Sequence, residues 1–262
     1  MVSRAFFILC LTLWMGCKSK EQASAVIPAH LLKTVVLCFH DITEDEVGKR
    51  LSRRYSVSLV HFRHILDALA GFKVVSLRDW VEAKDPADTR PRVVLTFDDG
   101  YASHRELVLP ELEKRKMGAT FFFYADQVKR DSAWRRTAAG RADFDFGSHS
   151  WSHALLKDTA YRALFRELYL ARTFLEEILH KDVKSFAWPY GYYDAEGVTA
   201  ARNAGFTYQV SVDYRIATRG DIEGVIPRYT IFGKDPVAQV RRILDEYRQK
   251  MPSASNQAPR RQ

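Results

Sequence analysis

The amino-acid sequence predicts an α/β domain whose strands are mostly parallel. Short apolar runs of strand length alternate with longer amphipathic segments, which is the order expected of strands joined by crossover helices. A length of 262 residues with 47% hydrophobic residues is enough for one large domain with a sizeable core. The motifs richest in acids and histidines directly follow predicted strands, where α/β barrels hold their functional sites. This pattern fits a sheet that is either open or closed as a barrel.

In the N-terminal half, short uninterrupted apolar runs predict strands at residues 35–39, 73–75 and 93–97. Residues 58–70 have helical periodicity and are followed by Gly71, which is typical of a helix end. Ser76 is a suitable cap for a second helix. The polar segment 43–57 is expected to form a surface loop, and residues 84–91 a linker.

The C-terminal half continues the alternation, with strands predicted at residues 119–124, 183–188 and 206–211 and an edge segment at 226–229. The aromatic run at 119–124 is typical of a strand buried on both faces. The longest helix is predicted at 159–179, because its leucines recur on one face. Further helices are expected at residues 105–116, within the polar segment 126–142, at 194–205 with Asp194 as its cap, and at 236–250.

Residues 1–16 have the features of an export signal. Their apolar run follows Arg4 and is too short to span a bilayer comfortably. Gly16-Cys17 after this run resembles a bacterial lipoprotein cleavage site, which predicts a lipid on Cys17 and a short tether over residues 17–32. An ordinary secretory signal or an uncleaved anchor is the alternative. The lipoprotein interpretation places the protein in the cell envelope, either periplasmic or at the surface.

The remaining cysteine and the C-terminal tail are less informative. Cys38 lies inside an apolar run and is most simply a small buried hydrophobic residue, so no disulfide framework is expected. Residues 251–262 are rich in Ser, Pro, Gln and Arg and are predicted to be disordered. The packed domain is therefore predicted to span residues 33–250.

The strand predicted at 93–97 ends in Asp98-Asp99-Gly100. Two adjacent carboxylates repel each other, so burying both requires a cation, a shared proton or strong hydrogen bonds. A metal ion would satisfy this requirement. The alternative is an ordinary Asp-Gly turn between two elements.

A second strand end, near Phe146, is followed by His149 and His153. On one helical turn this spacing places both imidazoles on the same face, and neutral imidazole is a favoured ligand of zinc. Together with Asp98 or Asp99 the histidines form a three-ligand set. Such a set leaves a coordination position open for water, as in catalytic zinc sites.

Three motifs resemble, in order and separation, the first three motifs of the polysaccharide deacetylases. They are Asp98-Asp99-Gly100, the pair His149 and His153, and Pro189-Tyr190-Gly191. This deacetylase family is the NodB homology group, carbohydrate esterase family four. The resemblance implies a distorted (β/α) barrel of the NodB type. It also implies that Asp98 is the catalytic base, that Asp99, His149 and His153 bind the metal, and that Tyr190 offers a backbone N–H to the oxyanion.

The first predicted strand also ends in ionisable residues, His40-Asp41. The family's usual C-terminal Leu-x-His motif is absent from this sequence. Phe39-His40-Asp41 resembles instead an N-terminal element of the circularly permuted poly-N-acetylglucosamine deacetylases, which implies that His40 is the general acid. An arginine that commonly pairs with the catalytic aspartate is replaced here by Ala187. Arg228 is a candidate substitute for it.

Candidate substrate contacts are Pro189 and Gly191 in the third motif and the aromatic residues Tyr101 and Trp151. Trp134 is a further candidate for stacking on a sugar, with core packing as the alternative for each aromatic residue. Asp213 is a candidate for orienting His40. The net charge of +8 suits contact with anionic envelope polymers, and no segment resembles a nucleic-acid-binding module.

The family resemblance therefore predicts a monomeric, metal-dependent hydrolase that removes N-acetyl groups from an N-acetylglucosamine-containing polysaccharide and releases acetate. Zn²⁺ is the expected metal, with Co²⁺ or Ni²⁺ as alternatives. Alternative functions are deacetylation of peptidoglycan, chitin or an O-acetyl ester. A surface lipoprotein that binds glycan or metal without turnover is the alternative from another class.

Overall fold

The computed structural model describes residues 29–44, 54–138, 141 and 144–251. The predicted signal at 1–16, most of the tether and nearly all of the predicted C-terminal tail lie outside the described residues. Within the described part of the chain, no helix is both long enough and apolar enough to span a membrane.

The strands form a curled, mostly parallel sheet in the order β10-β1-β5-β6-β7-β8-β9, with β11 paired to β1 and β4 paired to β5. Their bounds are β1 (Lys33–Phe39), β4 (Lys73–Val75), β5 (Arg92–Phe97), β6 (Ala119–Phe123), β7 (Phe144–Ser148), β8 (Ser185–Ala187), β9 (Tyr208–Val210), β10 (Ala217–Thr218) and β11 (Tyr229–Thr230). The short pair β2 (Ile42–Thr43) and β3 (Val57–Ser58) forms a separate sheet beside it.

The pairing confirms the predicted parallel arrangement. β1 runs parallel to β5 in a register that sets Phe39 beside Phe97, so the two strands end at the same level. Only the pairing of β1 with β10 is antiparallel among the described strands. A bridge between Val210 and Ile226 links the far edge of the sheet to the segment before β11, which curls the sheet into a distorted barrel.

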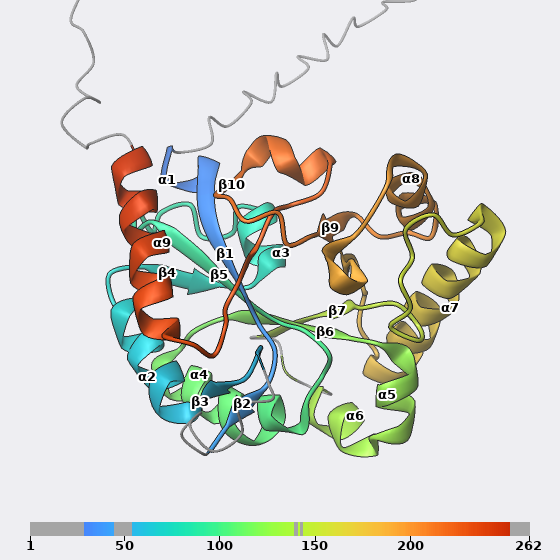
Figure 1. The fold of residues 1–262 in the computed structure, drawn as a ribbon, viewed down its shortest axis with the longest axis horizontal. Helices are drawn as coiled ribbons and strands as arrows, with labels where there is room; N and C mark the ends of the chain where they lie inside the picture. The colour runs from blue at the N-terminus through green and yellow to red at the C-terminus, as the bar shows by residue number, and fades with distance from the viewer. Residues whose placement is uncertain (1–28, 45–53, 139–140, 142–143, 252–262) are drawn as a thin grey trace, which may run out of the picture.

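Helices surround this sheet, as Figure 1 shows. They are α1 (Ala29–Leu32), α2 (Leu59–Ala68), α3 (Leu77–Val81), η1 (His104–Val108), α4 (Leu109–Arg115), α5 (Ala125–Arg130), α6 (Ser132–Ala138), α7 (Tyr161–Leu179), η2 (Pro189–Gly191), α8 (Ala195–Asn203), η3 (Arg219–Glu223) and α9 (Pro236–Lys250). The predicted caps are present: the side chains of Ser76 and Asp194 accept hydrogen bonds from the N–H groups of Asp79 and Gly197. The longest helix, α7, buries Leu164, Leu168, Leu175 and Leu179 as its periodicity predicts.

Two predictions need correction. The tether does not extend to residue 32, because Ala29–Leu32 forms α1, and Leu31 is fully buried and accepts a hydrogen bond from the Trp80 indole. Trp134 is not a sugar-stacking residue, because it is fully buried and its indole N–H donates to the Gly100 carbonyl at 2.9 Å. Burial of their apolar surface stabilises the side chains of Leu31 and Trp134 in the core more than an exposed position would.

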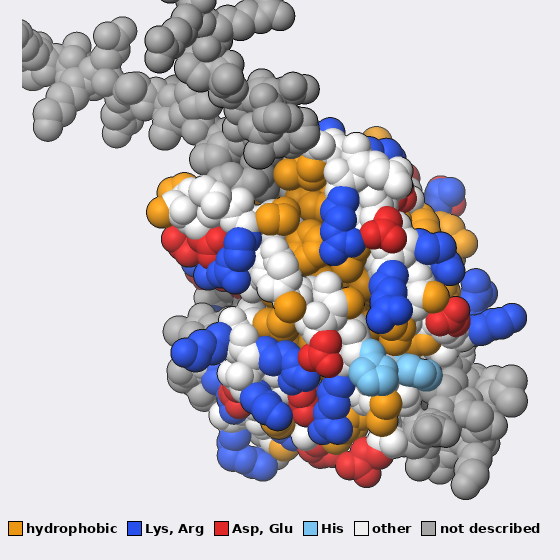
Figure 2. All heavy atoms as spheres, turned by 90° about the vertical axis from the view of Figure 1, so that its left-hand side faces the viewer, with side chains coloured by type: hydrophobic (Ala, Val, Ile, Leu, Met, Phe, Trp, Pro, Cys, Tyr) orange, Lys and Arg blue, Asp and Glu red, His pale blue; other side chains and the backbone are white. Residues whose placement is uncertain are grey.

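Charged residues of both signs are interspersed on the face shown in Figure 2, which is the side of α2 and α9 in Figure 1. Several are paired, including Arg63 with Glu111 and Lys250 with Glu246. The excess of basic residues therefore does not form a uniform basic stripe on this face.

Candidate active site

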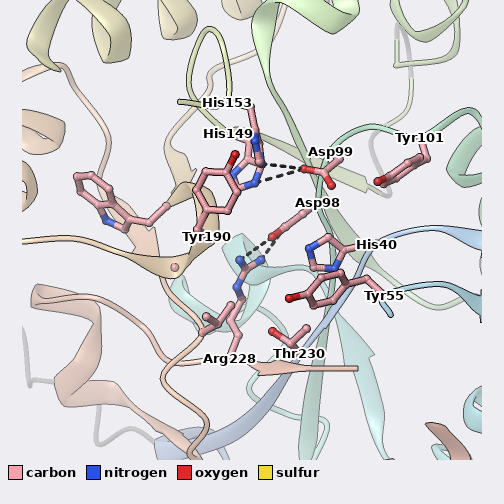
Figure 3. A pocket seen from close by; sticks show the side chains of 13 residues that line it. His40, Tyr55, Asp98, Asp99, Tyr101, His149, His153, Tyr190, Arg228 and Thr230 are labelled. Atoms are coloured by element: carbon pink, nitrogen blue, oxygen red, sulfur yellow. Dashed lines mark hydrogen bonds and ion pairs between the residues drawn. The ribbon is translucent and has the colours of Figure 1, made fainter. Parts of the chain in front are cut away.

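Residues from several parallel strands meet at the carboxyl end of the sheet. His40 follows β1, Asp98 and Asp99 follow β5, and His149 follows β7, because parallel strands that end at one level deliver their next residues to one edge. Together they line a pocket, which Figure 3 shows. The other sequence-predicted residues that line it are Tyr101, His153, Tyr190, Gly191 and Arg228.

Asp99, His149 and His153 converge at this pocket. The Asp99 Oδ1 atom lies 3.2 Å from Nε2 of His153 and 3.5 Å from Nε2 of His149. The candidate ligand atoms of the three residues all lie within 4.8 Å of one another. Both distances from Asp99 are shorter than about 5 Å, so one ion could bind this carboxylate and both imidazoles directly.

This cluster suits a divalent metal. The Asp99 Oδ1 atom is buried and faces the two imidazole nitrogens, but neither contact has the geometry of a full hydrogen bond, so a cation there would satisfy it. The Nδ1 atom of His149 is 2.7 Å from the Ala187 carbonyl and can donate to it. That bond leaves the Nε2 lone pair directed at Asp99, which is the arrangement expected of a metal-binding histidine.

The pKa values of the two histidines shift in opposite directions. Burial lowers the pKa of His149, which favours the neutral form that binds metals. Burial acts to lower the pKa of His153 as well, but the close contact with the Asp99 carboxylate and the charge of Asp98 together raise it. The pair of imidazoles packs edge to face with centroids 4.8 Å apart.

The backbone around the site is strained. Asp99, Ser150, His153 and Tyr190 all have positive φ, at 70°, 72°, 61° and 61°. Non-glycine residues adopt this conformation at a cost, and such positions cluster at functional sites. Three of these residues, Asp99, His153 and Tyr190, line the pocket.

Asp98 is held apart from the metal cluster by Arg228. The Nη1 and Nη2 atoms of Arg228 each donate to one carboxylate oxygen of Asp98 at 2.7 Å, and both side chains are buried. Burial acts to raise the pKa of Asp98, but Arg228, and after it His149, hold that pKa well below its usual range. Arg228, in the segment before β11, therefore supplies the cation that is missing at position 187, where the sequence has Ala187. The pairing suggested by the sequence is present.

The Cys38 thiol also approaches Asp98, with Sγ 3.3 Å from Oδ2. Cys38, His40 and Asp98 form a second group of candidate metal ligands. This group is the poorer metal site because Arg228 already neutralises Asp98, and burial raises the pKa of the Cys38 thiol well above its ordinary value.

His40 lies beside Asp98, away from His149 in Figure 3. Its Nδ1 atom has no hydrogen-bond partner among the described residues. Asp213 does not supply one: its carboxylate accepts hydrogen bonds from the hydroxyls of Ser211 and Tyr193, at 2.6 and 2.8 Å. The interpretation that Asp213 orients His40 is therefore wrong.

The third motif forms a tight turn at the rim of the pocket. Tyr190 and Gly191 both have positive φ, and a Cβ on Gly191 would lie 2.2 Å from the Cγ2 atom of Val212. Only glycine fits this close approach. The Tyr190 side chain is 57% exposed, and its ring centroid lies 4.8 Å from that of His153.

Two of the predicted substrate contacts are absent from the pocket lining. Pro189 is the buried first residue of the turn, and the centroid of the Trp151 ring lies 5.4 Å from that of Phe174 in α7. The lining also includes four residues that the sequence did not single out, namely Tyr55, Trp188, Val212 and Thr230. Of these, only Trp188 carried a sequence signal, because it directly precedes the third motif.

Comparisons with known proteins agree with the geometry. Residues 85–209 match the family model described as polysaccharide deacetylase, a range that contains the acid pair, both histidines and the third motif. The poly-beta-1,6-N-acetyl-D-glucosamine N-deacetylase of Staphylococcus aureus is 23% identical over 235 residues, which cover 82% of this chain and 80% of that protein. His40 and Arg228 lie outside the range matched by the family model.

Solved structures share the fold. The deacetylase PplD of Streptococcus pyogenes, in complex with acetate, has a TM-score of 0.71 at 18% identity and covers 81% of this chain and 98% of its own. IcaB from Ammonifex degensii has a TM-score of 0.67 at 23% identity and covers 80% of this chain and 95% of its own. These likenesses confirm the predicted barrel.

Proposed function

We propose that this chain, whose residues 85–209 match the polysaccharide deacetylase family model, removes N-acetyl groups from an N-acetylglucosamine polysaccharide with a divalent metal bound by Asp99, His149 and His153. The observation that carries this proposal is the separation of the adjacent acids. Asp99 faces two imidazoles, whereas Asp98 pairs with Arg228 and is free of the cluster. One carboxylate is thus available as a ligand and the other for proton transfer.

The chain's own residues account for the steps of amide hydrolysis. A metal bound to the three ligands supplies Lewis-acid polarisation of the acetyl carbonyl and of the attacking water. Asp98, kept ionised by Arg228, accepts the proton of that water as general base. The Tyr190 backbone N–H stabilises the oxyanion, and His40 donates a proton to the departing amine. Acetate and a free amino sugar leave the site.

Zn²⁺ is the metal that this set of ligands favours. Two imidazoles and one carboxylate form a common catalytic zinc site, and one position remains for water. Co²⁺ and Ni²⁺ accept the same ligands and are the alternatives.

The substrate is proposed from the relatives together with the pocket. The Staphylococcus aureus relative is named for acting on poly-beta-1,6-N-acetyl-D-glucosamine. Exposed aromatic rings at the pocket, Tyr55 and Tyr190, suit contact with the apolar faces of sugar rings. Tyr101 also lines the pocket and is proposed to contact the same substrate.

An export signal at residues 1–16 and a lipid on Cys17 would place the enzyme in the cell envelope as a monomer close to its polymer. The sequence Gly16-Cys17 after a short apolar run supports this. Replacing Cys17 with alanine should release the protein from the membrane fraction into the soluble fraction, as measured by fractionation of cells. Equal membrane association of the wild type and Cys17→Ala would contradict lipid attachment.

The enzymatic proposal is tested by acetate release. Purified protein should release acetate from N-acetylglucosamine oligomers, and the Asp98→Asn variant should be at least about 100-fold slower, because a positioned general base contributes at least that factor. Chelation should abolish the activity, and Zn²⁺ or Co²⁺ should restore it. Peptidoglycan, chitin oligomers and an O-acetyl ester, assayed in parallel, identify the preferred polymer. Binding of these polymers without acetate release would favour a non-catalytic glycan-binding protein.

A further inference from the structure

The loop from His149 to His153 carries two of the three proposed ligands in a strained backbone. Ser150 and His153 have φ angles of 72° and 61°. Side chains disfavour this conformation, so the loop needs contacts that hold it in place.

The first part of the loop is held by backbone hydrogen bonds. The His149 N–H donates to the Phe123 carbonyl at 2.7 Å, at the end of β6. The carbonyls of Ser150 and Trp151 accept hydrogen bonds from the first N–H groups of α5, each at 3.0 Å. The His149 backbone is therefore held by β6 and the next two residues by α5, and substitution of a side chain cannot easily remove these backbone bonds.

The second part of the loop depends on one carboxylate of α7. The backbone N–H and the hydroxyl of Ser152 both donate to Oε1 of Glu167, each at 2.7 Å. Within the described parts of the chain, these are the only hydrogen bonds that join Ser152 to another element. The His153 N–H bonds within the loop, to the Ser150 hydroxyl at 2.9 Å. The Trp151 ring adds an apolar contact with α7 through Phe174.

We propose that Glu167 is a positioning residue for the metal site, holding Ser152 so that the His153 imidazole remains opposite Asp99. This inference rests on the proposed function. Bonds to an ionised acceptor are stronger than neutral ones, which suits Glu167 to stabilise a strained turn. Without it, Ser152 is free to move and His153 can relax from its positive φ towards an ordinary backbone conformation, while His149 stays in place. The metal would then lose one of its three protein ligands from the productive geometry.

Metal affinity measures this role directly. Protein stripped with a chelator is titrated with Zn²⁺ in competition with a chromogenic chelator, for the wild type and for Glu167→Ala, Glu167→Gln and Glu177→Gln. Loss of a residue that orients a ligand typically weakens binding by about 10-fold to 100-fold. We expect at least tenfold weaker binding in Glu167→Ala, and a smaller loss in Glu167→Gln, whose amide oxygen still accepts a hydrogen bond. Glu177 is exposed on the same helix, so Glu177→Gln should bind Zn²⁺ as the wild type does.

Thermal unfolding of the metal-free proteins separates positioning from general instability. Similar melting temperatures with weaker Zn²⁺ binding support the inference, and an altered Co²⁺ absorption spectrum in Glu167→Ala would show directly that the ligand geometry has changed. Should Glu167→Ala not fold, Ser152→Ala decides the matter, because it removes one of the two donors: weaker Zn²⁺ binding supports the inference, and unchanged binding overturns it.

The outcomes distinguish this inference from the proposed function. Zn²⁺ affinity within twofold of the wild type in folded Glu167→Ala would overturn the role of Glu167 and leave the metal site intact. Failure of the wild type itself to bind Zn²⁺ would instead overturn the proposed function.

Discussion

At the scale of single residues, the buried pair of Asp98 and Arg228 sets the chemistry of the site. Both side chains are within 3% of full burial, and two bonds of 2.7 Å join them. Burying a single unpaired charge is costly, so each of these two side chains needs the opposite charge of the other in order to remain buried and ionised. The pair keeps one acid ionised and separate from its neighbour Asp99.

Replacing Arg228 with methionine should damage both stability and activity. The variant leaves the Asp98 carboxylate buried without its partner, which should lower the free energy of unfolding by about 3–5 kcal/mol. Acetate release should fall by at least about 100-fold, because an unpaired buried carboxylate takes up a proton and cannot act as a base. Urea unfolding and an acetate assay measure the two effects.

Two controls accompany this variant. The double variant Asp98→Asn/Arg228→Met removes both charges and should be more stable than Arg228→Met, while remaining inactive. Arg248→Met breaks an exposed pair with Asp245 and should change the free energy of unfolding by no more than about 1 kcal/mol. Wild-type activity in Arg228→Met would contradict the role of the pair.

At the scale of elements, the helix predicted at 105–116 does not form as one α-helix. It begins with η1, a π-helical turn at His104–Val108, and continues as α4. Such turns are frequent at functional sites. Here the turn buries His104, whose Nε2 atom bonds to the carbonyl oxygen of His40, and so η1 supports the backbone beside the proposed general acid.

His104 should make the stability of the fold depend on pH. Burial lowers the pKa of His104 to about 4, outweighing the hydrogen bond to His40 and the charges of Asp99 and Asp41, which act to raise it. In the unfolded chain the pKa is about 6.5, so between these values the unfolded state binds more protons than the folded state. The free energy of unfolding should therefore fall as the pH drops from about 6.5 to about 4, by about 3 kcal/mol from this residue alone.

Urea unfolding of the wild type and of His104→Gln at several pH values measures this contribution. Glutamine can still donate to the His40 carbonyl but does not titrate. The difference in the free energy of unfolding between the two proteins should shift in favour of His104→Gln as the pH falls. Parallel pH profiles would show that His104 titrates normally in the folded protein.

At the scale of the whole molecule, the proposed metal site joins segments that are far apart in sequence. Asp99 follows β5, His149 follows β7, and His153 lies in the loop held by α5 and α7. These three residues come together only when the barrel has folded. A metal bound there is therefore expected to stabilise the folded state and not the unfolded chain.

Addition of Zn²⁺ to chelator-treated protein should raise the melting temperature. A free concentration 100-fold above the dissociation constant contributes about 2.7 kcal/mol, which for a domain of this size corresponds to a shift of about 5–10 °C. Asp99→Ala should lose most of this shift in a thermal unfolding assay. An equal shift in Asp99→Ala would indicate that the metal binds elsewhere, for instance at Cys38 and His40.

The sequence by itself was sufficient for the local features of this protein. Apolar runs predicted the main strands, and the periodic leucines of α7 and the caps Ser76 and Asp194 predicted helices that are present. The family resemblance also carried over, because the acids, histidines and third motif each occupy short segments whose spacing is visible in the sequence. Such patterns depend only on neighbouring residues, so one sequence contains them completely.

Only the tertiary structure decided how distant segments meet. It showed that Arg228 pairs with Asp98 across 130 residues, that Asp213 bonds to Ser211 and Tyr193 instead of His40, and that Trp134 belongs to the core. It also placed Glu167 against the loop that carries His153. These contacts follow from the curvature of the sheet and from helix packing, which bring together side chains whose separation along the chain carries no periodic signal.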